Sequence, residues 1–213
     1  MHTIPIFPLP LVIAPGECIA LHIFEPRYKE MISRCRRETG RGEGHFVIAW
    51  LVGTRVAAIG GVMSIERILK EQEDGKLDLV ARCEERCRIV EFTEEASYQT
   101  AQTSSVADMR KDWSEPLATR TFKLHRELLR MVIGEIPDES FYCGLAALSF
   151  RILPSSGLPA EVKQQIIEMT DENERLEFVC DHLEQQIRGM AEVLGKIAEI
   201  CSAWHMRSLS DRQ

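Results

Sequence analysis

The sequence lacks the short motifs that mark nucleotide-binding proteins, serine hydrolases and zinc peptidases. It has no Gly-x-x-x-x-Gly-Lys-Ser/Thr loop, no Gly-x-Ser-x-Gly elbow and no His-Glu-x-x-His pair. The glycine-rich stretch at residues 40–44 is followed by neither a Lys-Ser/Thr pair nor a helical pattern, so it predicts a solvated loop. We therefore expect no catalytic residues, no cofactor and no enzymatic activity.

Long apolar runs are also missing. No segment approaches the ~18 consecutive apolar residues that a membrane helix needs. The first residues show no basic segment followed by an apolar one, as a secretory signal has. The seven cysteines are odd in number and irregularly spaced, which indicates free thiols in a reducing compartment. These absences predict a cytoplasmic protein that does not bind a membrane.

Positive charge is in deficit. The 26 Lys and Arg against 33 Asp and Glu give a formal net charge of -7. Sequence-independent binding to nucleic acid needs clustered Lys and Arg, so this balance argues against a nucleic-acid partner. The 213 residues are enough for one large domain or two small ones with a buried core, without disulfide or metal staples.

Residues 1–106 carry β-strand patterns and one helical segment. Prolines interrupt the apolar run near residues 4–10, which predicts an edge strand or an extended arm, because proline cannot donate to a ladder. Residues 18–24 predict a second strand, and a helix is expected to begin at Pro26. Further apolar stretches and the turn signal Asp74-Gly75 predict a mostly antiparallel β subdomain.

Residues 116–206 carry helical patterns and follow a polar stretch, residues 107–115, that we expect to be a linker. The last helical pattern is the longest. Asp171, with Glu174 three residues later, begins a stripe of apolar residues spaced by three and four positions. This stripe predicts a final helix of ~34 residues, followed by a disordered tail at residues 207–213.

Cysteine and histidine positions do not predict a metal site. Cys83 and Cys87 would lie ~13 Å apart on a continuous strand, too far for one zinc ion, so both are expected to be buried as small apolar residues. His22 sits within an apolar strand and is expected to be a buried, hydrogen-bonded histidine.

The N-terminal stretch carries a long and specific motif. The run His-Ile-Phe-Glu-Pro-Arg-Tyr at residues 22–28 follows Ile-Pro-Ile-Phe-Pro-Leu at residues 4–9, and Asp-Glu-Asn-Glu-Arg-Leu occurs later at residues 171–176. Together these resemble the amino-terminal domain of Lon proteases, over residues 4–187. The chain departs from the family pattern at Cys83 and Cys87, where the family usually has a glycine and an aromatic residue.

The resemblance implies an α+β fold: an N-terminal antiparallel β pseudo-barrel of the PUA-like type with one helix, then a helical subdomain ending in a long helix. The ATPase and Ser–Lys peptidase domains of a Lon protease are not encoded here. The resemblance therefore implies the recognition domain on its own, a non-catalytic module for polypeptide substrates or partner proteins. Implied partners are unfolded or degron-bearing polypeptides and a protease or ATPase, with the chain itself a monomer or weak homodimer.

Peptide contacts are expected at the first strand and at the loop between residues 37 and 44, since such a module would hold an extended peptide in a groove or at a sheet edge. The candidate contacts are Phe7, Leu9, Phe24 and Trp113. The signature residues are expected to be structural and to fix the strand-to-helix junction, with Arg27 paired to a carboxylate or a backbone carbonyl. They are His22, Glu25, Pro26, Arg27 and Tyr28.

Two alternatives stay open. Because PUA-like folds also bind small molecules or RNA, the chain is alternatively a module of that kind, with a defined pocket or a basic stripe. A third hypothesis, a hydrolase, predicts a cleft that joins a nucleophile and a base within ~3 Å.

Overall fold

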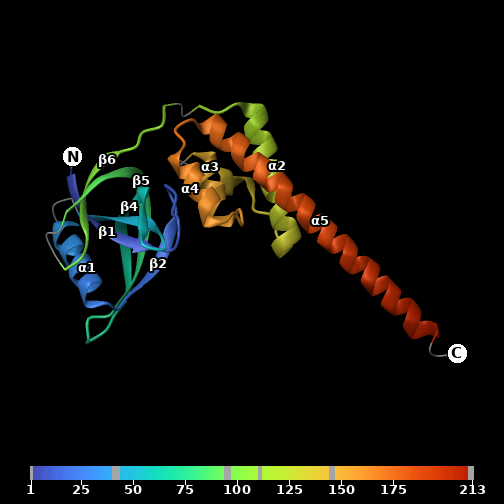
Figure 1. Ribbon diagram of the computed structural model, residues 1–213, viewed down its shortest axis with the longest axis horizontal. Coiled ribbons are helices and arrows are strands. Elements are labelled where there is room, and N and C mark those ends of the chain that lie inside the picture. Colours follow the sequence, from blue (N-terminus) through green and yellow to red (C-terminus); the bar gives the residue numbers. More distant parts are fainter. Residues whose placement is uncertain (1, 40–43, 94–96, 110–111, 144–146, 211–213) are drawn as a thin grey trace.

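The computed structural model has two halves, a β barrel and a bundle of helices from which the last helix projects (Figure 1). It describes residues 2–39, 44–93, 97–109, 112–143 and 147–210. The strands are β1 (His2–Leu9), β2 (Cys18–Ile23), β3 (His45–Val52), β4 (Arg55–Glu71), β5 (Leu77–Thr93) and β6 (Thr100–Ser105). The helices are α1 (Pro26–Thr39), α2 (Glu115–Ile133), α3 (Leu148–Ile152), α4 (Ala160–Glu168) and α5 (Glu172–Ser210), with 3-10 turns η1 (Glu139–Tyr142) and η2 (Leu153–Ser155). The predicted α+β class and order of the two halves are confirmed.

The six strands form one sheet in the order β2-β5-β4-β3-β1-β6, and a further pairing of β5 with β6 closes it into a ring. Most neighbours are antiparallel, as predicted, but β1 and β3 are parallel. Strand β5 is long enough to pair with β2 through its first half and with β6 through its second half. Strand β2 therefore lies outside the ring, at the edge of the sheet.

The expectation that the proline-bearing first strand is an edge strand was wrong. β1 is paired on both sides, with β6 over His2–Pro5 and with β3 over Ile6–Leu9. The N–H of Ile6 donates to Gln99 O of the β6 side, and backbone groups alternate in direction along a strand. The nitrogen of Pro8 therefore points towards the β6 side, at a position past the last β1–β6 pair. The nitrogen of Pro5 points towards the β3 side, at a position before the first β1–β3 pair. Each proline sits where no ladder donor is needed.

Helix α5 begins where the capping pattern predicted. The Asp171 carboxylate accepts hydrogen bonds from the N–H groups of Asn173 at 2.9 Å and Glu174 at 3.4 Å, so it caps the first turn. The helix continues to Ser210, into the stretch where a disordered tail was expected, while residues 211–213 lie outside the described residues. No helix in the described ranges is long and apolar enough to cross a membrane.

Each half has an apolar core, and the core of the helical half also takes in Val12, Ala14 and Ile59 of the barrel. The barrel core packs α1 against the inner faces of β2, β3 and β5, and the core of the helical half packs α2, α3 and α4 against the first half of α5. Cys83 and Cys87 are both buried on the single strand β5, as the sequence predicted. Burial raises the pKa of both thiols, that of Cys87 to about 12, so both remain protonated and inert.

Candidate functional site

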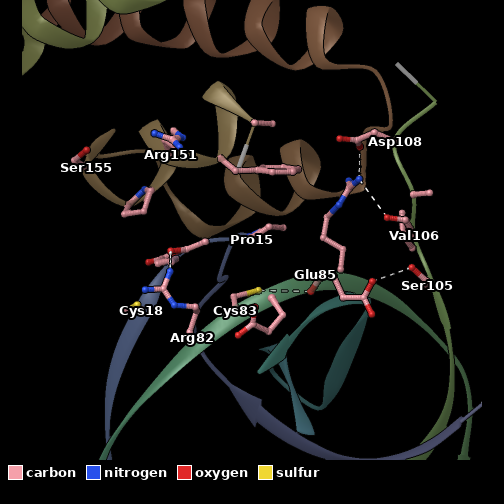
Figure 2. A pocket seen from close by; sticks show the side chains of 18 of the residues that line it. Pro15, Cys18, Arg82, Cys83, Glu85, Ser105, Val106, Asp108, Arg151 and Ser155 are labelled. Atoms are coloured by element: carbon pink, nitrogen blue, oxygen red, sulfur yellow. Dashed lines mark hydrogen bonds and ion pairs between the residues drawn. The ribbon is translucent and has the colours of Figure 1, made fainter. Parts of the chain in front are cut away.

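A cleft of about 1180 Å³ lies between the barrel and the helical half (Figure 2). One wall is formed by the turn before β2 and by the middle of β5. The opposite wall is formed by α3, η2 and the segment that follows β6. Charged, polar and aromatic side chains line the cleft, among them Glu17, Cys18, Arg82, Glu84, Glu85, Arg86, Asp108, Trp113, Phe141, Phe150, Arg151 and Ser155.

The floor of the cleft is the part of β5 where its neighbour on one side changes. β2 pairs with β5 as far as Arg82, and β6 begins to pair at Cys87. Between these points the Cys83 N–H donates to the carbonyl of Glu17 at 2.8 Å. No strand among the described residues lies beside residues 83–86 on that side, which opens the barrel surface there.

The helical wall supplies aromatic surface. Trp113 is 44% exposed although it lines the cleft, and Phe141 is also exposed. Phe150 is buried at the back of the wall, where its ring packs on two guanidinium groups. Exposed aromatic rings beside a cleft offer apolar contact to a ligand without further rearrangement.

Charges of both signs surround the cleft. Arg82 pairs with Glu66 at 3.4 Å, and the Glu85 carboxylate accepts a hydrogen bond from the Ser105 hydroxyl at 3.1 Å (Figure 2). Burial raises the pKa of the Glu17 carboxyl, and its hydrogen bond from the Ala14 N–H acts in the opposite direction. The site therefore lacks the uniformly positive surface that a phosphate chain needs.

A buried arginine fixes the two halves relative to each other. Arg86, on β5, is 3% exposed and donates to the backbone carbonyls of Ile167 at 2.8 Å and Met169 at 2.6 Å, at the end of α4. It also forms an ion pair with Asp108, in the segment that follows β6 (Figure 2). One barrel side chain thus bonds two carbonyls of the helical half and the carboxylate of the segment that joins the halves.

A second arginine extends this network into the helical half. Arg175 donates to both carboxylate oxygens of Asp108 and pairs with Glu172 at 2.8 Å. The Glu172 carboxylate also accepts from the backbone N–H and hydroxyl of Ser149 at 3.0 and 2.7 Å. Because every charge here has an opposite partner, the network is satisfied although it is buried.

The four candidate peptide contacts are not brought together. Phe7 is 7% exposed in the barrel core, with its ring centroid 4.2 Å from that of Tyr28, so a peptide cannot reach it. Leu9 is partly buried against the same core. Phe24 is 56% exposed next to β2, and only Trp113 lines the cleft.

The predicted rim at residues 37–44 cannot be placed, because residues 40–43 lie outside the described residues. The other predicted rim, the first strand, is internal to the sheet. Its place at an edge is taken by β2.

The signature residues lie at the junction of β2 and α1. Pro26 is the first residue of α1, and Arg27 forms an ion pair with Glu25 at 2.8 Å while its guanidinium lies 4.5 Å from the Tyr28 ring centroid. The expected pairing of Arg27 with a carboxylate is therefore present. These contacts hold the strand-to-helix turn.

The expectation that His22 is buried was wrong. Its side chain is 52% exposed, and its Nδ1 lies 2.6 Å from Asp78 Oδ1 on the neighbouring strand. The reason is the alternation of β2, in which Leu21 and Ile23 point into the core and the residue between them points outward.

One hydroxyl–imidazole pair matches the spacing that a hydrolase would need. Ser155 Oγ lies 3.0 Å from His125 Nε2, and His125 Nδ1 lies 2.8 Å from the Tyr142 hydroxyl. However, His125 is fully buried, and burial lowers its pKa to about 4. Such a weak base is poorly matched to removing a serine proton near neutral pH, so the pair acts here as a satisfied buried hydrogen-bond group.

The part of the chain that the structure describes contains no group of three or more His, Cys, Asp or Glu side chains that could hold a metal ion.

A second, smaller groove of about 530 Å³ lies between the end of α2 and α5. It is lined mainly by aliphatic side chains, including Leu128, Val132, Met190 and Leu194.

Sequence reasoning missed the residues that position the cleft. Arg86 and Asp108 lie far apart along the chain, and Asp108 falls in the stretch that was expected to be a linker. Arg175 lies in the Asp-x-x-x-Arg-Leu motif, which was the available signal. A motif cannot show that its arginine reaches a carboxylate 67 residues earlier.

Solved structures of similar fold come from two bacteria. The "Lon N-terminal domain protein from Xanthomonas campestris" has 23% identity and a TM-score of 0.64, covering 83% of this chain and 96% of that one. The N-terminal domain of Mycobacterium avium complex Lon protease has 18% identity and a TM-score of 0.62, covering 86% and 98%. No curated protein matches this chain in sequence.

The sequence also matches a family model, described as the ATP-dependent protease La (LON) substrate-binding domain, over residues 3–185. This match spans both halves of the fold and the whole cleft between them. The chain therefore belongs to the LON substrate-binding domain family.

Proposed function

We propose that this chain binds segments of polypeptide substrates or partner proteins in the cleft between its two halves. The observation that carries the proposal is the cleft itself, at about 1180 Å³, with aromatic side chains on one wall and polar backbone and charged groups on the other. Drug-sized ligands occupy pockets of roughly 300–1,000 Å³, so this volume exceeds what one small molecule requires.

The chemistry of the walls supports a peptide ligand. Trp113 and Phe141 offer apolar surface, while Arg82, Arg151 and Glu85 offer charges of both signs. A peptide combines apolar side chains with a backbone of donors and acceptors, and this mixture complements such walls.

The alternative of a PUA-like small-molecule or RNA-binding module is less well supported. Glu17, Glu84 and Glu85 all line the barrel side of the cleft, and their negative charge opposes a phosphate backbone. The volume of the cleft also exceeds what a single small ligand requires.

The buried ion-pair network supports a cleft that exists before the ligand arrives. Arg86 and Arg175 both bind Asp108 and so hold the two walls at a set separation. A preformed site loses less conformational entropy on binding, which favours affinity for a flexible chain.

The proposal includes a non-catalytic role in the cytoplasm, with unfolded or degron-bearing polypeptides as ligands and a protease or ATPase as further partner. All seven cysteines are free, which suits a reducing compartment. The family's own description as a substrate-binding domain supports a binding role rather than a chemical one.

The test compares two exposed aromatic residues. Casein-derived peptides on a cellulose array are probed with the purified protein, and the strongest binder is labelled with fluorescein for titration. Trp113→Ala should weaken the binding of this peptide about tenfold, because it removes an aromatic contact at the centre of the binding site. Phe92→Ala, which removes an equally exposed ring outside the cleft, should leave affinity unchanged. Equal affinity of both variants and the wild type would refute the cleft as the site.

A further inference from the structure

Strand β2 presents a free edge of the sheet. Among the described residues it pairs with β5 alone, and no backbone hydrogen bond joins Cys18–Ile23 to a segment on its other side. A free edge exposes a row of N–H and C=O groups that another extended chain can pair with.

The direction of each backbone group on β2 follows from one hydrogen bond. The carbonyl of Glu17 accepts from the Cys83 N–H and so faces β5. Backbone groups alternate along a strand, and the β2–β5 register runs without a bulge from Cys18 to Ile23. The N–H and C=O groups of Ile19, Leu21 and Ile23 therefore face β5. The residues whose N–H and C=O groups face the free edge are Cys18, Ala20 and His22.

This edge lacks three of the features that natural proteins use to block strand addition. It carries no proline, no lysine and no bulge between Cys18 and Ile23. Its one ionisable outward side chain besides the Cys18 thiol, His22, is paired with Asp78. β1 differs, because its pairing with β6 ends at Pro5 and Pro8 has no N–H to donate on the side left unpaired.

The free edge begins at the cleft. Cys18, the first residue of β2, lines the cleft together with Glu17, and it lies near Arg82 (Figure 2). A chain that lies in the cleft and passes over Cys18 is delivered directly to the edge of β2. The cleft and the edge thus share Cys18.

We propose that an extended segment of the bound polypeptide adds to β2 as a further strand of the sheet. This inference rests on the proposed function and assigns a binding mode to it. The alternating N–H and C=O groups at the edge are complementary to another extended backbone. The inward side chains of the added strand would lie beside Ile19, which is only partly buried, so apolar residues at alternate positions are favoured.

The decisive variant is Ala20→Pro. The N–H of Ala20 faces the free edge. Proline at this position removes that donor, and its ring occupies the space where an added strand would approach, without breaking a β2–β5 hydrogen bond. Ala20→Ser is the matched control, because it changes the same exposed position and keeps the backbone N–H. With the fluorescein-labelled casein peptide as probe, Ala20→Pro should bind about tenfold more weakly, and Ala20→Ser should bind like the wild type.

Amide hydrogen exchange of the unmodified protein gives a second measurement that does not depend on the variant folding. Saturation with the casein peptide should slow exchange at Ala20 and His22. Exchange at Leu21 should be slow with and without peptide, because its N–H already bonds β5. Unchanged exchange at Ala20 and His22 in the saturated complex would overturn the inference.

The remaining outcomes separate this inference from the proposed function. Wild-type affinity in a folded Ala20→Pro variant, together with weakened binding by Trp113→Ala, would overturn strand addition and leave the cleft intact. Absence of peptide binding by the wild type would overturn both. Dimerisation without peptide that Ala20→Pro abolishes would show that a second copy occupies the edge, which also overturns the inference.

Discussion

The guanidinium of Arg175 faces the carboxylate of Asp108 with two parallel hydrogen bonds, Nη1 to Oδ1 at 2.7 Å and Nη2 to Oδ2 at 2.8 Å. Arg175 lies in the first turn of α5, and Asp108 lies just after β6. The pair therefore fastens the helical half to the barrel. Because Arg86 binds the same carboxylate, one aspartate serves two buried cations.

Replacing Asp108 with asparagine should destabilise the protein strongly. The change keeps the size of the side chain but leaves Arg86 and Arg175 with only Glu172 as a negative partner. Removing one member of a buried ion pair costs roughly 3–5 kcal/mol in the free energy of unfolding. Urea denaturation followed by circular dichroism measures this loss. Asp112→Asn, at an exposed aspartate in the same segment, should change stability by less than about 0.5 kcal/mol.

Stability should fall in acid through His125. Its pKa is about 4 in the folded protein against an ordinary value of 6.5, so between these pH values the unfolded state binds the extra proton. The contribution is present above pH 6.5 and is lost as the pH falls towards 4, by up to about 3 kcal/mol. Urea midpoints across this range should drop more for the wild type than for His125→Gln. Parallel curves for the two proteins would contradict the assignment, as would an NMR titration of this ring with a midpoint near 6.5.

Two glycine-to-alanine substitutions should have opposite effects. A Cβ at Gly60 would lie 2.7 Å from the carbonyl oxygen of Ile48 on β3, and backbone there cannot move aside cheaply. We expect Gly60→Ala to cost roughly 1–3 kcal/mol. At Gly189, on α5, a Cβ meets nothing within 4 Å, and alanine should stabilise the helix by up to about 1 kcal/mol. Thermal denaturation of both variants checks the signs. Stabilisation by Gly60→Ala would contradict the close approach of β3 and β4, and destabilisation by Gly189→Ala would contradict the open space at that position.

Ser155 should not react as an activated nucleophile. Its partner His125 has a pKa of about 4 and is a weak base, in contrast to the histidine of a serine hydrolase. Incubation with a fluorophosphonate at neutral pH, followed by mass spectrometry, should find no adduct at Ser155. Stoichiometric labelling that Ser155→Ala abolishes would instead support the hydrolase hypothesis.

Several local features were predictable because neighbouring residues decide them. Pro26 begins α1, Asp171 caps α5, and Arg27 pairs with a carboxylate two residues away. Each depends on contacts within a few positions of the chain. The same local argument should have placed His22 outside, since the alternation of Leu21 and Ile23 was visible in the sequence.

The position of a strand within the sheet was not predictable in this way. Prolines in β1 indicated an edge, yet β1 is internal because its two partners bond different halves of it. The free edge belongs to β2, whose sequence contains no feature that marks an edge. Strand order depends on which distant segments pair, and local propensity does not encode it.

The sequence by itself determined the two halves of this protein, the family to which its motif belongs, and the starts of α1 and α5, because periodicity and capping act over a few residues. Tertiary structure alone decided the cleft. It arises where β2 and β6 meet different halves of β5, and where Arg86 and Arg175 converge on Asp108. These contacts join residues far apart in the chain, and only folding brings their charges and backbone groups within bonding distance.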